Sequence, residues 1–224
     1  MKKEKIKGAI FDIDGTLIDS MPIWMTVPDR YLELQGKKAE PDIAEKVFSM
    51  TMDQSAEYMR TRYGLNLTVD EIKQGFIDVV TDFYRTEVTL KPGVHEFLSE
   101  LEKRGIPMVL ATVGDADLAS STLERLGVLG YFSDLLTAKD LDTDKTEPTI
   151  YLKAAESIGC RPSETAVFED VVHALDTARK AEFITVAVED VASEKDRKKI
   201  EAMSDFYLKT YHDFSINPGF EVFG

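Results

Sequence analysis

Five short, mainly apolar runs are spread along the chain, and they limit its fold more than any other feature of the sequence. They are KGAIFD, IPMVLAT, TAVFED, FITVAVE and DFYLK, at residues 7–12, 106–112, 165–170, 183–189 and 205–209. Apolar runs without polar alternation are typical of strands that are covered on both faces, as in parallel sheets. Helical patterns that end at Gly105, Gly127 and Gly159 lie between them and supply the crossovers that parallel strands need. The sequence therefore predicts an α/β domain.

The segment between the first two runs is far longer than the ~12 residues that a single crossover helix needs. Its helical patterns are IWMTVPDRYLELQG, MDQSAEYMRTRYG and VDEIKQGFIDVVTDFYRTE, and none of it reads as a convincing strand. We therefore expect an all-helical domain at residues 20–87, inserted into a core formed by residues 1–19 and 88–224. The tail SINPGFEVFG, at residues 215–224, is expected to be a loosely attached end whose aromatic residues rest on the core.

The composition limits the partners of the protein. Its formal net charge of −14 opposes non-specific attraction to DNA, RNA or anionic lipid, so we expect neither a nucleic-acid nor a membrane partner. No apolar run approaches the ~18 residues of a membrane span, and no apolar region follows the basic residues of MKKEKIKG, so we expect no export signal. The single cysteine, Cys160, permits no internal disulfide, which fits the cytoplasm. A monomer is compatible with the sequence, which does not determine the oligomeric state.

Two aspartates close the first apolar run, in AIFDIDGTLIDS at residues 9–20. Strand periodicity sends side chains i and i+2 to the same side, so Asp12 and Asp14 are expected to share a small space. That space lies beyond the carboxyl end of a strand, where α/β sheets bind ligands. Two carboxylates so close raise one pKa or recruit a cation, and hard oxygen ligands favour Mg²⁺. Gly15 allows a tight turn there, and Thr16 offers a hydroxyl.

The Asp-x-Asp spacing alone carries little information in so acidic a chain. It recurs at Asp115 and Asp117, at Asp140 and Asp142, and at Asp142 and Asp144. The run DLDTDK even imitates the start of a calcium loop, but Lys145 stands where that loop needs glycine and Tyr151 where it needs glutamate. We therefore reject a calcium site, and the assignment of the first pair depends on residues at other strand ends.

Two other segments offer groups that suit a phosphate. The second apolar run ends at Thr112, whose hydroxyl could bind phosphate oxygens together with the backbone N–H groups of Val113 and Gly114. Lys145 lies just ahead of a helix expected at residues 147–158 and offers a counter-charge to a phosphoryl group. These groups would supply the local positive charge that an anionic substrate requires.

The run TAVFED ends in Glu169 and Asp170, a usual kind of place for further metal carboxylates. The combined pattern of DIDGT, then Thr112, then Lys145, then ED resembles the haloacid dehalogenase-like hydrolase superfamily, which consists mostly of Mg²⁺-dependent phosphatases. The resemblance covers nearly the whole chain. Its motif order and helical insertion are similar to the branch that holds phosphoglycolate-phosphatase-like enzymes and β-phosphoglucomutase, in which the insertion is a mobile cap.

The resemblance implies a Rossmann-like parallel sheet core with helices on both faces, an inserted all-helical cap, and chemistry through an aspartyl-phosphate. Asp12 would be the nucleophile, and Asp14 would act first as an acid and then as a base. The ligands implied for Mg²⁺ are Asp12, the backbone oxygen of Asp14, and Asp170, with Glu169 close by. Lys145 and Thr112 would hold the phosphate oxygens.

Four positions depart from the family pattern. Thr146 follows Lys145 where proline is common, Val113 stands where a small polar residue is frequent, and Val171 and Ala174 replace the serine and glycine that often follow the ED pair. These changes spare the charged groups, so they bear on the substrate class more than on the reaction type.

We expect a cytoplasmic Mg²⁺-dependent phosphatase that hydrolyses a small phosphomonoester, such as a sugar or polyol phosphate. A β-phosphoglucomutase-like enzyme that passes the phosphoryl group to a bound sugar would use the same residues, although Thr16 favours a phosphatase because the mutases more often carry valine there. A non-catalytic protein that only binds a phosphorylated metabolite is a further alternative, but all the charged catalytic positions are present. Trp24, Met21 and Met25 are expected to pack in the first inserted helix rather than to line a substrate pocket.

Overall fold

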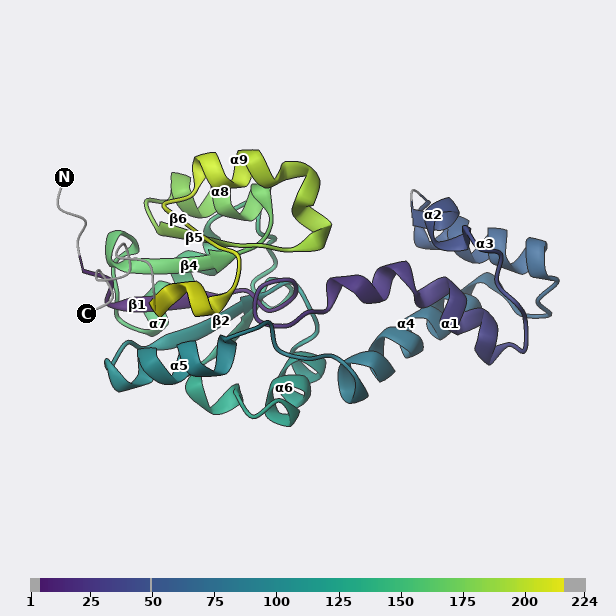
Figure 1. Cartoon of the computed structure of the whole chain (residues 1–224), viewed down its shortest axis with the longest axis horizontal. Coiled ribbons are helices and arrows are strands. Elements are labelled where there is room, and N and C mark those ends of the chain that lie inside the picture. The colour runs from purple at the N-terminus through teal and green to yellow at the C-terminus, as the bar shows by residue number, and fades with distance from the viewer. Residues whose placement is uncertain (1–4, 49, 216–224) are drawn as a thin grey trace. The chain divides into compact units, whose positions relative to one another are not determined.

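The computed structural model describes residues 5–48 and 50–215, and the chain divides into two compact units. One unit, formed by Met1–Met21 and Thr89–Gly224, contains the sheet, and the other, Pro22–Val88, is helical (Figure 1). Apart from Ser215, the tail whose attachment the sequence analysis addressed lies outside the described residues. In the described ranges, no helix combines the length and the apolar content needed to cross a membrane.

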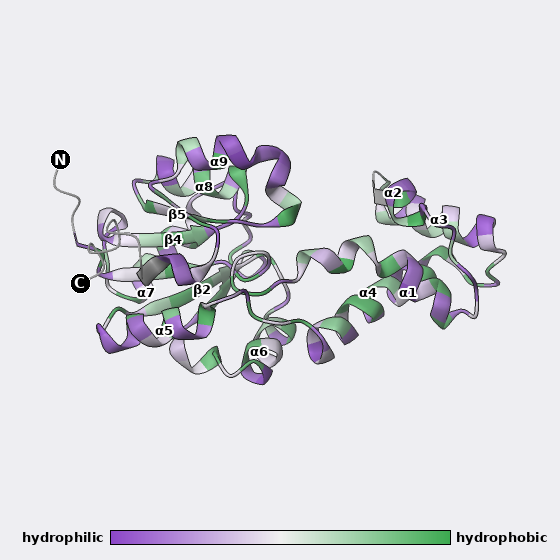
Figure 2. Ribbon diagram, viewed as in Figure 1, coloured by the Kyte–Doolittle hydropathy of each residue, from purple (hydrophilic) through white to green (hydrophobic). Residues whose placement is uncertain are grey.

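The sheet of the first unit has six parallel strands in the order β3-β2-β1-β4-β5-β6. They are β1 (Gly8–Phe11), β2 (Met108–Thr112), β3 (Leu135–Thr137), β4 (Thr165–Glu169), β5 (Ile184–Val188) and β6 (Phe206–Leu208). Strands β1, β2 and β4 are buried at every residue, and the labelled strands are largely hydrophobic in Figure 2. This confirms that the apolar runs without polar alternation are strands covered on both faces. The chain runs from β1 to β2 and β3 on one side and returns to β4 on the other. This reversal creates the crevice at which open α/β sheets bind ligands.

The predicted set of five strands was incomplete, because it lacked β3. This edge strand contains only three residues, and Leu135 and Leu136 are partly exposed. Its apolar residues are only Leu135 and Leu136, whereas the equally short β6 has three apolar residues in a row, so the β3 segment did not stand out as an apolar run.

Helices cover both faces of the sheet (Figure 1). The helices of this unit are α5 (Val94–Lys103), α6 (Ala116–Arg125), α7 (Thr149–Ser157), α8 (Val172–Lys180) and α9 (Arg197–Met203), with 3₁₀ turns at Leu129–Tyr131, Pro162–Glu164, Val191–Asp196 and Tyr211–Ser215. On one face, Ile10 of β1 and Val167 of β4 belong to an apolar cluster with α7 and α8. On the other, the Phe11 ring stacks on Phe168 at 4.2 Å between centroids and meets the edge of Phe97 of α5 at 6.2 Å. This alternation places the residue after Phe11 and the residue after Phe168 on the side of α7.

The helical unit begins with a 3₁₀ turn, Met21–Met25, which the domain division cuts after its first residue. Four α-helices follow: α1 (Val27–Leu34), α2 (Ile43–Phe48), α3 (Met52–Tyr63) and α4 (Val69–Thr86). The single helix expected at residues 23–36 is therefore divided, and Pro28 occupies the first turn of α1, where its missing N–H costs no hydrogen bond. Helix α2, with only six residues, was not predicted.

Two capping boxes fix the starts of the longer helices in this unit. The Thr51 hydroxyl accepts the N–H of Gln54, whose side chain returns to the Thr51 N–H, and Thr68 and Glu71 repeat the arrangement at α4. Tyr31 of α1 packs edge-on against Phe76 of α4, with 4.9 Å between the ring centroids, in the centre of the unit's own apolar core.

Trp24 and Met25 do not join that core. Each is 43% exposed, so the prediction that they pack into the inserted helix is wrong. Trp24 belongs to the short 3₁₀ turn rather than to α1, and this turn places only Ile23 among its buried residues.

The two chain segments that connect the units are paired with each other on the sheet side. Ile18 and Leu90 form an antiparallel bridge. The Asp19 N–H donates to the Thr89 carbonyl at 3.0 Å, and the Lys91 N–H donates to the Leu17 carbonyl at 2.9 Å. The segment that leaves the sheet unit and the segment that returns to it therefore lie side by side at residues 17–19 and 89–91.

Candidate active site

Asp12 stands at the carboxyl end of β1 and is held by the neighbouring strand. Its N–H donates to the Phe168 carbonyl at 3.0 Å, which extends the β1–β4 ladder by one bond. Gly15 follows with φ of +75°, and a Cβ atom there would lie 2.5 Å from Oδ2 of Asp170. Only glycine therefore permits both this turn and the close approach of the Asp170 carboxylate.

Lys145 connects two of the predicted site carboxylates. Its Nζ forms ion pairs with Oδ1 of Asp12 and with Oε1 of Glu169, the latter at 2.6 Å. The hydroxyl of Tyr151 on α7 donates to the same Glu169 oxygen at 2.8 Å, and all four side chains are buried. Burial opposes the charge on Lys145, but the Asp12 and Glu169 carboxylates outweigh it and raise the pKa of the amine above its ordinary value. Lys145 therefore stays an ammonium in the interior.

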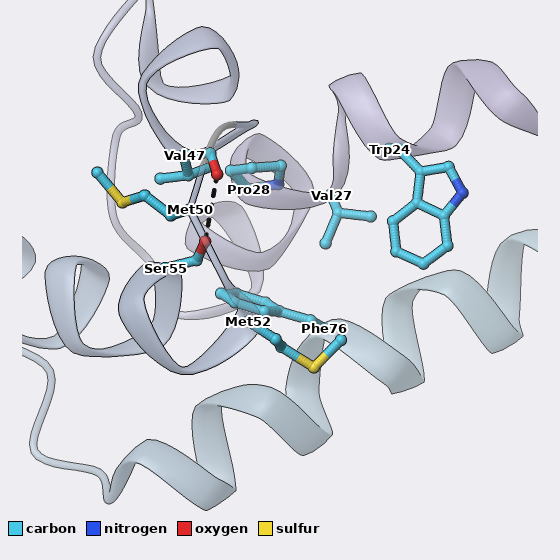
Figure 3. A pocket seen from close by; sticks show the side chains of 8 residues that line it. All are labelled: Trp24, Val27, Pro28, Val47, Met50, Met52, Ser55 and Phe76. Atoms are coloured by element: carbon cyan, nitrogen blue, oxygen red, sulfur yellow. Dashed lines mark hydrogen bonds between the residues drawn. The ribbon is translucent and has the colours of Figure 1, made fainter. Parts of the chain in front are cut away.

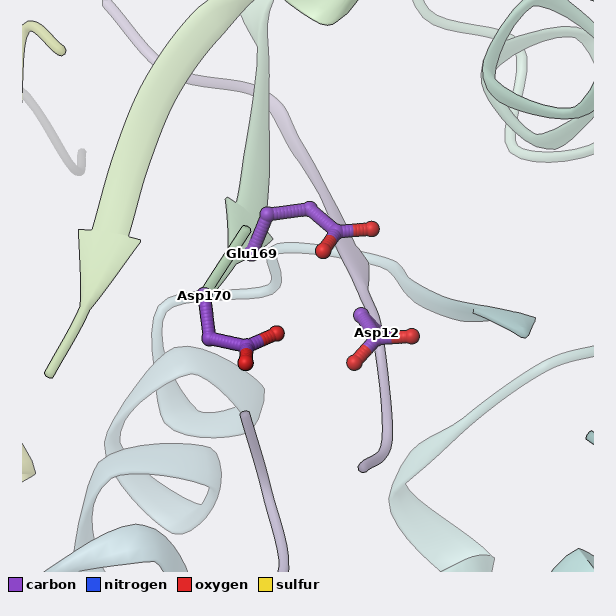
Figure 4. A group of neighbouring side chains, drawn as sticks. All are labelled: Asp12, Glu169 and Asp170. Atoms are coloured by element: carbon purple, nitrogen blue, oxygen red, sulfur yellow. The ribbon is translucent and has the colours of Figure 1, made fainter. Parts of the chain in front are cut away.

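Three buried carboxylates converge beside this lysine: Asp12 from the end of β1, and Glu169 and Asp170 from the end of β4 (Figure 4). One oxygen of each lies within 4.8 Å of the others. Burial raises the pKa of Glu169 to about 7, against the opposing ammonium of Lys145 and with the added repulsion of Asp12. Burial, followed by repulsion from Asp12, Glu169 and Asp190, raises the pKa of Asp170 well above its usual range.

This cluster fits a divalent cation of the Mg²⁺ type. Its donors are hard carboxylate oxygens, and its negative charge exceeds what the ammonium of Lys145 compensates. A second lysine nearby does not change that balance, because Lys91 Nζ is paired with Oδ2 of Asp190 at 2.8 Å and donates to the Glu189 carbonyl at 2.7 Å. A bound cation would lower the pKa of both Glu169 and Asp170.

Asp14 lies outside this cluster of three. Its Oδ1 accepts a hydrogen bond from the Ser20 hydroxyl at 2.7 Å. A Cβ atom on Gly114 would lie 3.6 Å from its Oδ2, so the Asp14 carboxylate faces the loop after β2. The two aspartates of the motif thus have different neighbours: Asp12 contacts an ammonium, whereas Asp14 contacts a hydroxyl and a loop. The predicted use of the Asp14 backbone oxygen as a metal ligand stays a prediction.

The loop after β2 places the other predicted phosphate-binding groups. Thr112 is buried, and its Oγ1 accepts the N–H of Gly114 at 2.9 Å. The threonine hydrogen is therefore available to an acceptor such as a phosphate oxygen, whereas the Gly114 N–H is engaged. Val113, between them, has a side chain that is 62% exposed.

Thr16 was predicted to contact substrate, and the structure places its hydroxyl next to Asp170 of the carboxylate cluster. Its side chain is fully buried. Its hydroxyl lies 3.5 Å from Oδ1 of Asp170, at the outer limit of a hydrogen bond. The Thr16 hydroxyl therefore contacts Asp170, a candidate metal ligand, and its contact with substrate stays a prediction.

Several groups around the site were not predicted. They are Ser20, Lys91, Tyr151 and Asp190. A signal existed for Asp190, which follows the apolar run of β5 as Asp170 follows that of β4. Tyr151 lies six residues after Lys145, but this spacing is no signal, because aromatic residues are common on the apolar faces of helices whether or not they contact a site. Ser20 and Lys91 carried no signal that sequence reasoning could use.

The match to a family model decides the classification. The model described as haloacid dehalogenase-like hydrolase matches residues 9–188, which include the whole helical unit and every residue of the cluster. The chain belongs to the haloacid dehalogenase-like hydrolase family. The resemblance inferred from DIDGT, Thr112, Lys145 and the ED pair is thereby confirmed.

Relatives in the haloacid dehalogenase-like family are named phosphatases. Hexitol phosphatase A of Escherichia coli is 28% identical, over 74% of this chain and 75% of its own. The phosphorylated carbohydrates phosphatase of Thermotoga maritima is 24% identical, over 79% of this chain and 82% of its own. A solved structure from Thermotoga maritima has a TM-score of 0.83 at 22% identity and covers 94% of this chain and 98% of its own, which confirms the fold.

Proposed function

We propose that the protein is a Mg²⁺-dependent hydrolase of small phosphomonoesters, with sugar or polyol phosphates as the substrate class and Asp12 as the nucleophile. The observation that carries the proposal is the buried bridge from Asp12 through Lys145 to Glu169, beside Asp170. The names of the relatives, which include a hexitol phosphatase and a phosphorylated carbohydrates phosphatase, support the substrate class. A cytoplasmic location and a cap role for Pro22–Val88 are parts of the same proposal.

The first step is attack by a carboxylate oxygen of Asp12 on phosphorus. A bond forms between that oxygen and phosphorus, and the bond between phosphorus and the ester oxygen breaks. The departing alkoxide takes a proton from Asp14, which the Ser20 hydroxyl holds in place. Lys145 would orient the Asp12 carboxylate through their ion pair, and the Thr112 hydroxyl, which keeps its own hydrogen while it accepts the Gly114 N–H, would donate to a phosphoryl oxygen.

The second step returns the enzyme to its starting state. Asp14, now a carboxylate, takes a proton from a water molecule whose oxygen attacks phosphorus. A bond forms between that oxygen and phosphorus, the bond between phosphorus and the Asp12 oxygen breaks, and inorganic phosphate leaves. Asp12, Asp170 and the backbone oxygen of Asp14 would hold Mg²⁺ with Glu169 close by, and the ion would supply positive charge to the phosphoryl oxygens.

Phosphate release from an aryl phosphate and from a panel of hexose and hexitol phosphates tests the proposal, with and without Mg²⁺. We expect turnover that requires the metal and falls by at least about 10³-fold in Asp12→Asn. Asp29→Asn, a change of an exposed aspartate on α1, is the matched control and should keep full activity.

Three results would contradict parts of the proposal. Full activity in Asp12→Asn would show that Asp12 is not the nucleophile. Conversion of β-glucose 1-phosphate to glucose 6-phosphate without phosphate release would assign a phosphomutase instead. Tight binding of a phosphate ester with no turnover across the panel would assign a non-catalytic binding protein.

A further inference from the structure

The helical unit contains a pocket of about 260 Å³, and the described residues that line it all belong to that unit (Figure 3). Buried side chains of the unit's core, including Val27 and Phe76, form part of its wall. Trp24 and Met52 also line it, yet they are 43% and 41% exposed. A large indole and a thioether thus stand at the open side of a space that the core has not filled, although burying them would be favourable.

The lining of this pocket indicates what it can hold. Among its described lining residues none is charged, and the one hydroxyl, on Ser55, is committed to the Val47 carbonyl at 3.3 Å. A charged group would therefore lose its hydration without gaining a partner. The aromatic rings of Trp24 and Phe76 and the sulfur of Met52 instead suit a ring, through ring–ring and sulfur–ring contacts. The volume exceeds the ~150 Å³ of a cavity that binds benzene, so one or two rings fit.

We propose that this pocket is a binding site for a small, uncharged, ring-bearing group, such as a benzyl or cyclohexyl group. The proposal rests on the pocket alone and goes beyond the phosphatase function. A substrate that carries a ring and a separate small molecule would both satisfy this chemistry, and kinetic competition distinguishes these two sources.

Binding is tested with benzyl alcohol as the probe, with glycerol as the polar control, on the full chain. Trp24 is the only tryptophan, so its emission reports on this pocket directly. We expect a saturable blue shift with benzyl alcohol and none with glycerol, with a Kd of about 1 mM or below. In spectra of ¹³C-methyl methionine, the signals of Met50 and Met52 should shift, whereas that of Met59, buried in the same unit's core, should not.

A pair of matched variants locates the site. Met52→Glu places a charge in the lining and should weaken binding at least about 10-fold. Ile77→Glu makes the same change at a side chain that is 46% exposed and outside the lining, and should leave binding unchanged. Non-saturable shifts, an equal shift of Met59, or unaltered binding in Met52→Glu would overturn the proposal. So would a Trp24 emission that depends on protein concentration without ligand, because a second copy of the chain would then cover the pocket.

To find the source of the ring, the hydrolysis rates of benzyl phosphate and of glycerol phosphate are measured in the presence of benzyl alcohol. If benzyl alcohol competitively inhibits the hydrolysis of benzyl phosphate but not that of glycerol phosphate, the ring belongs to the substrate. Saturable binding without competition assigns it to a separate ligand. A chain without phosphatase activity would still show the methionine and tryptophan shifts, so failure of the proposed function and failure of this site are distinguishable.

Discussion

The hydroxyl of Tyr151 and the ammonium of Lys145 donate to the same oxygen, Oε1 of Glu169, at 2.8 and 2.6 Å. Tyr151 projects from α7, and Lys145 lies in the turn just before that helix, so one short segment positions both donors. Because two donors occupy Oε1, Oε2 is the Glu169 oxygen that can take a further partner such as a metal or a water. Tyr151 is thus a positioning residue for the carboxylate cluster.

Tyr151→Phe should destabilise the fold and slow the reaction. Loss of a buried hydrogen bond to a carboxylate is expected to lower the free energy of unfolding by about 1.5–3 kcal/mol, measured by denaturant titration. Because Glu169 loses a donor to its charged form, its pKa should rise further, and the Mg²⁺ concentration for half-maximal binding in calorimetry should rise as well. The control is Tyr207→Phe, which removes a partly exposed tyrosine bond to Glu189 of 3.2 Å. Equal metal affinity in the two variants would contradict the positioning role.

Asp170→Asn should change stability in opposite directions with and without metal. The pKa of Asp170 is raised in the folded state above its value of about 4 in the unfolded chain. The carboxyl therefore ionises more readily in the unfolded chain, and the fold loses stability as the pH rises above about 4. In EDTA at neutral pH, the variant should therefore melt at a higher temperature than the natural chain. With Mg²⁺ at about 100 times its Kd, the natural chain should gain about 2.7 kcal/mol and the variant much less. An equal Mg²⁺-induced shift in both proteins, measured by calorimetry, would exclude Asp170 as a ligand.

Glu164 should make the fold sensitive to acid. Arg161 binds its carboxylate through two hydrogen bonds of 2.8 and 2.9 Å, Lys7 adds an ion pair of 2.5 Å, and together they lower its pKa to about 2. Because the pKa of Glu164 is lower in the folded state than the unfolded value of about 4.3, its ionised carboxylate stabilises the fold at pH values above about 4.3. This stabilisation is lost as the pH falls toward 2. Glu164→Gln should flatten the fall of the melting temperature in that window, whereas Glu102→Gln on the surface of α5 should not. Both cations are mostly exposed, so salt should weaken the difference.

Tyr31→Phe should stabilise the helical unit. Among the described residues, the Tyr31 hydroxyl is one of the buried polar groups without a hydrogen-bond partner, and burial raises its pKa. Removing it should raise the free energy of unfolding by about 1 kcal/mol, because no bond is lost and a desolvated hydroxyl disappears. Tyr63→Phe should have the opposite sign, because the Tyr63 oxygen accepts the Glu40 N–H at 3.1 Å. Chemical denaturation of both variants checks the pair.

The sequence predicted the parts of the site that depend on strand ends. Parallel strands bring their carboxyl ends to one edge, so Asp12 after β1 and Glu169 and Asp170 after β4 had to lie near one another once the runs were recognised as strands. Lys145 could be added because it precedes the helix that follows β3, and a crossover helix between parallel strands begins at the edge where the strands end. Local pattern and topology were sufficient for these four residues.

Other features depend on contacts that the sequence does not encode locally. The pairing of Lys91 with Asp190 requires the strand order β1-β4-β5, and β3 contains only two apolar residues, too few to stand out as a run. The exposure of Trp24 could not be predicted, because composition predicts burial for a tryptophan and only the division of the first inserted helix leaves it at a pocket. In the sequence, Tyr151 was indistinguishable from the other residues on the apolar face of α7, so the contact of its hydroxyl with Glu169 could not be predicted.

The bridge between Ile18 and Leu90 also bears on how such a chain can evolve. Since the two ends of the helical segment meet in one hydrogen-bonded pair, deletion of that segment would leave a gap that a short hairpin turn could close without disturbing β1 or α5. The same adjacency lets a segment of a different length replace it. We therefore expect that the helical unit can be exchanged during evolution while the carboxylates and Lys145, which lie on the sheet unit, keep their positions.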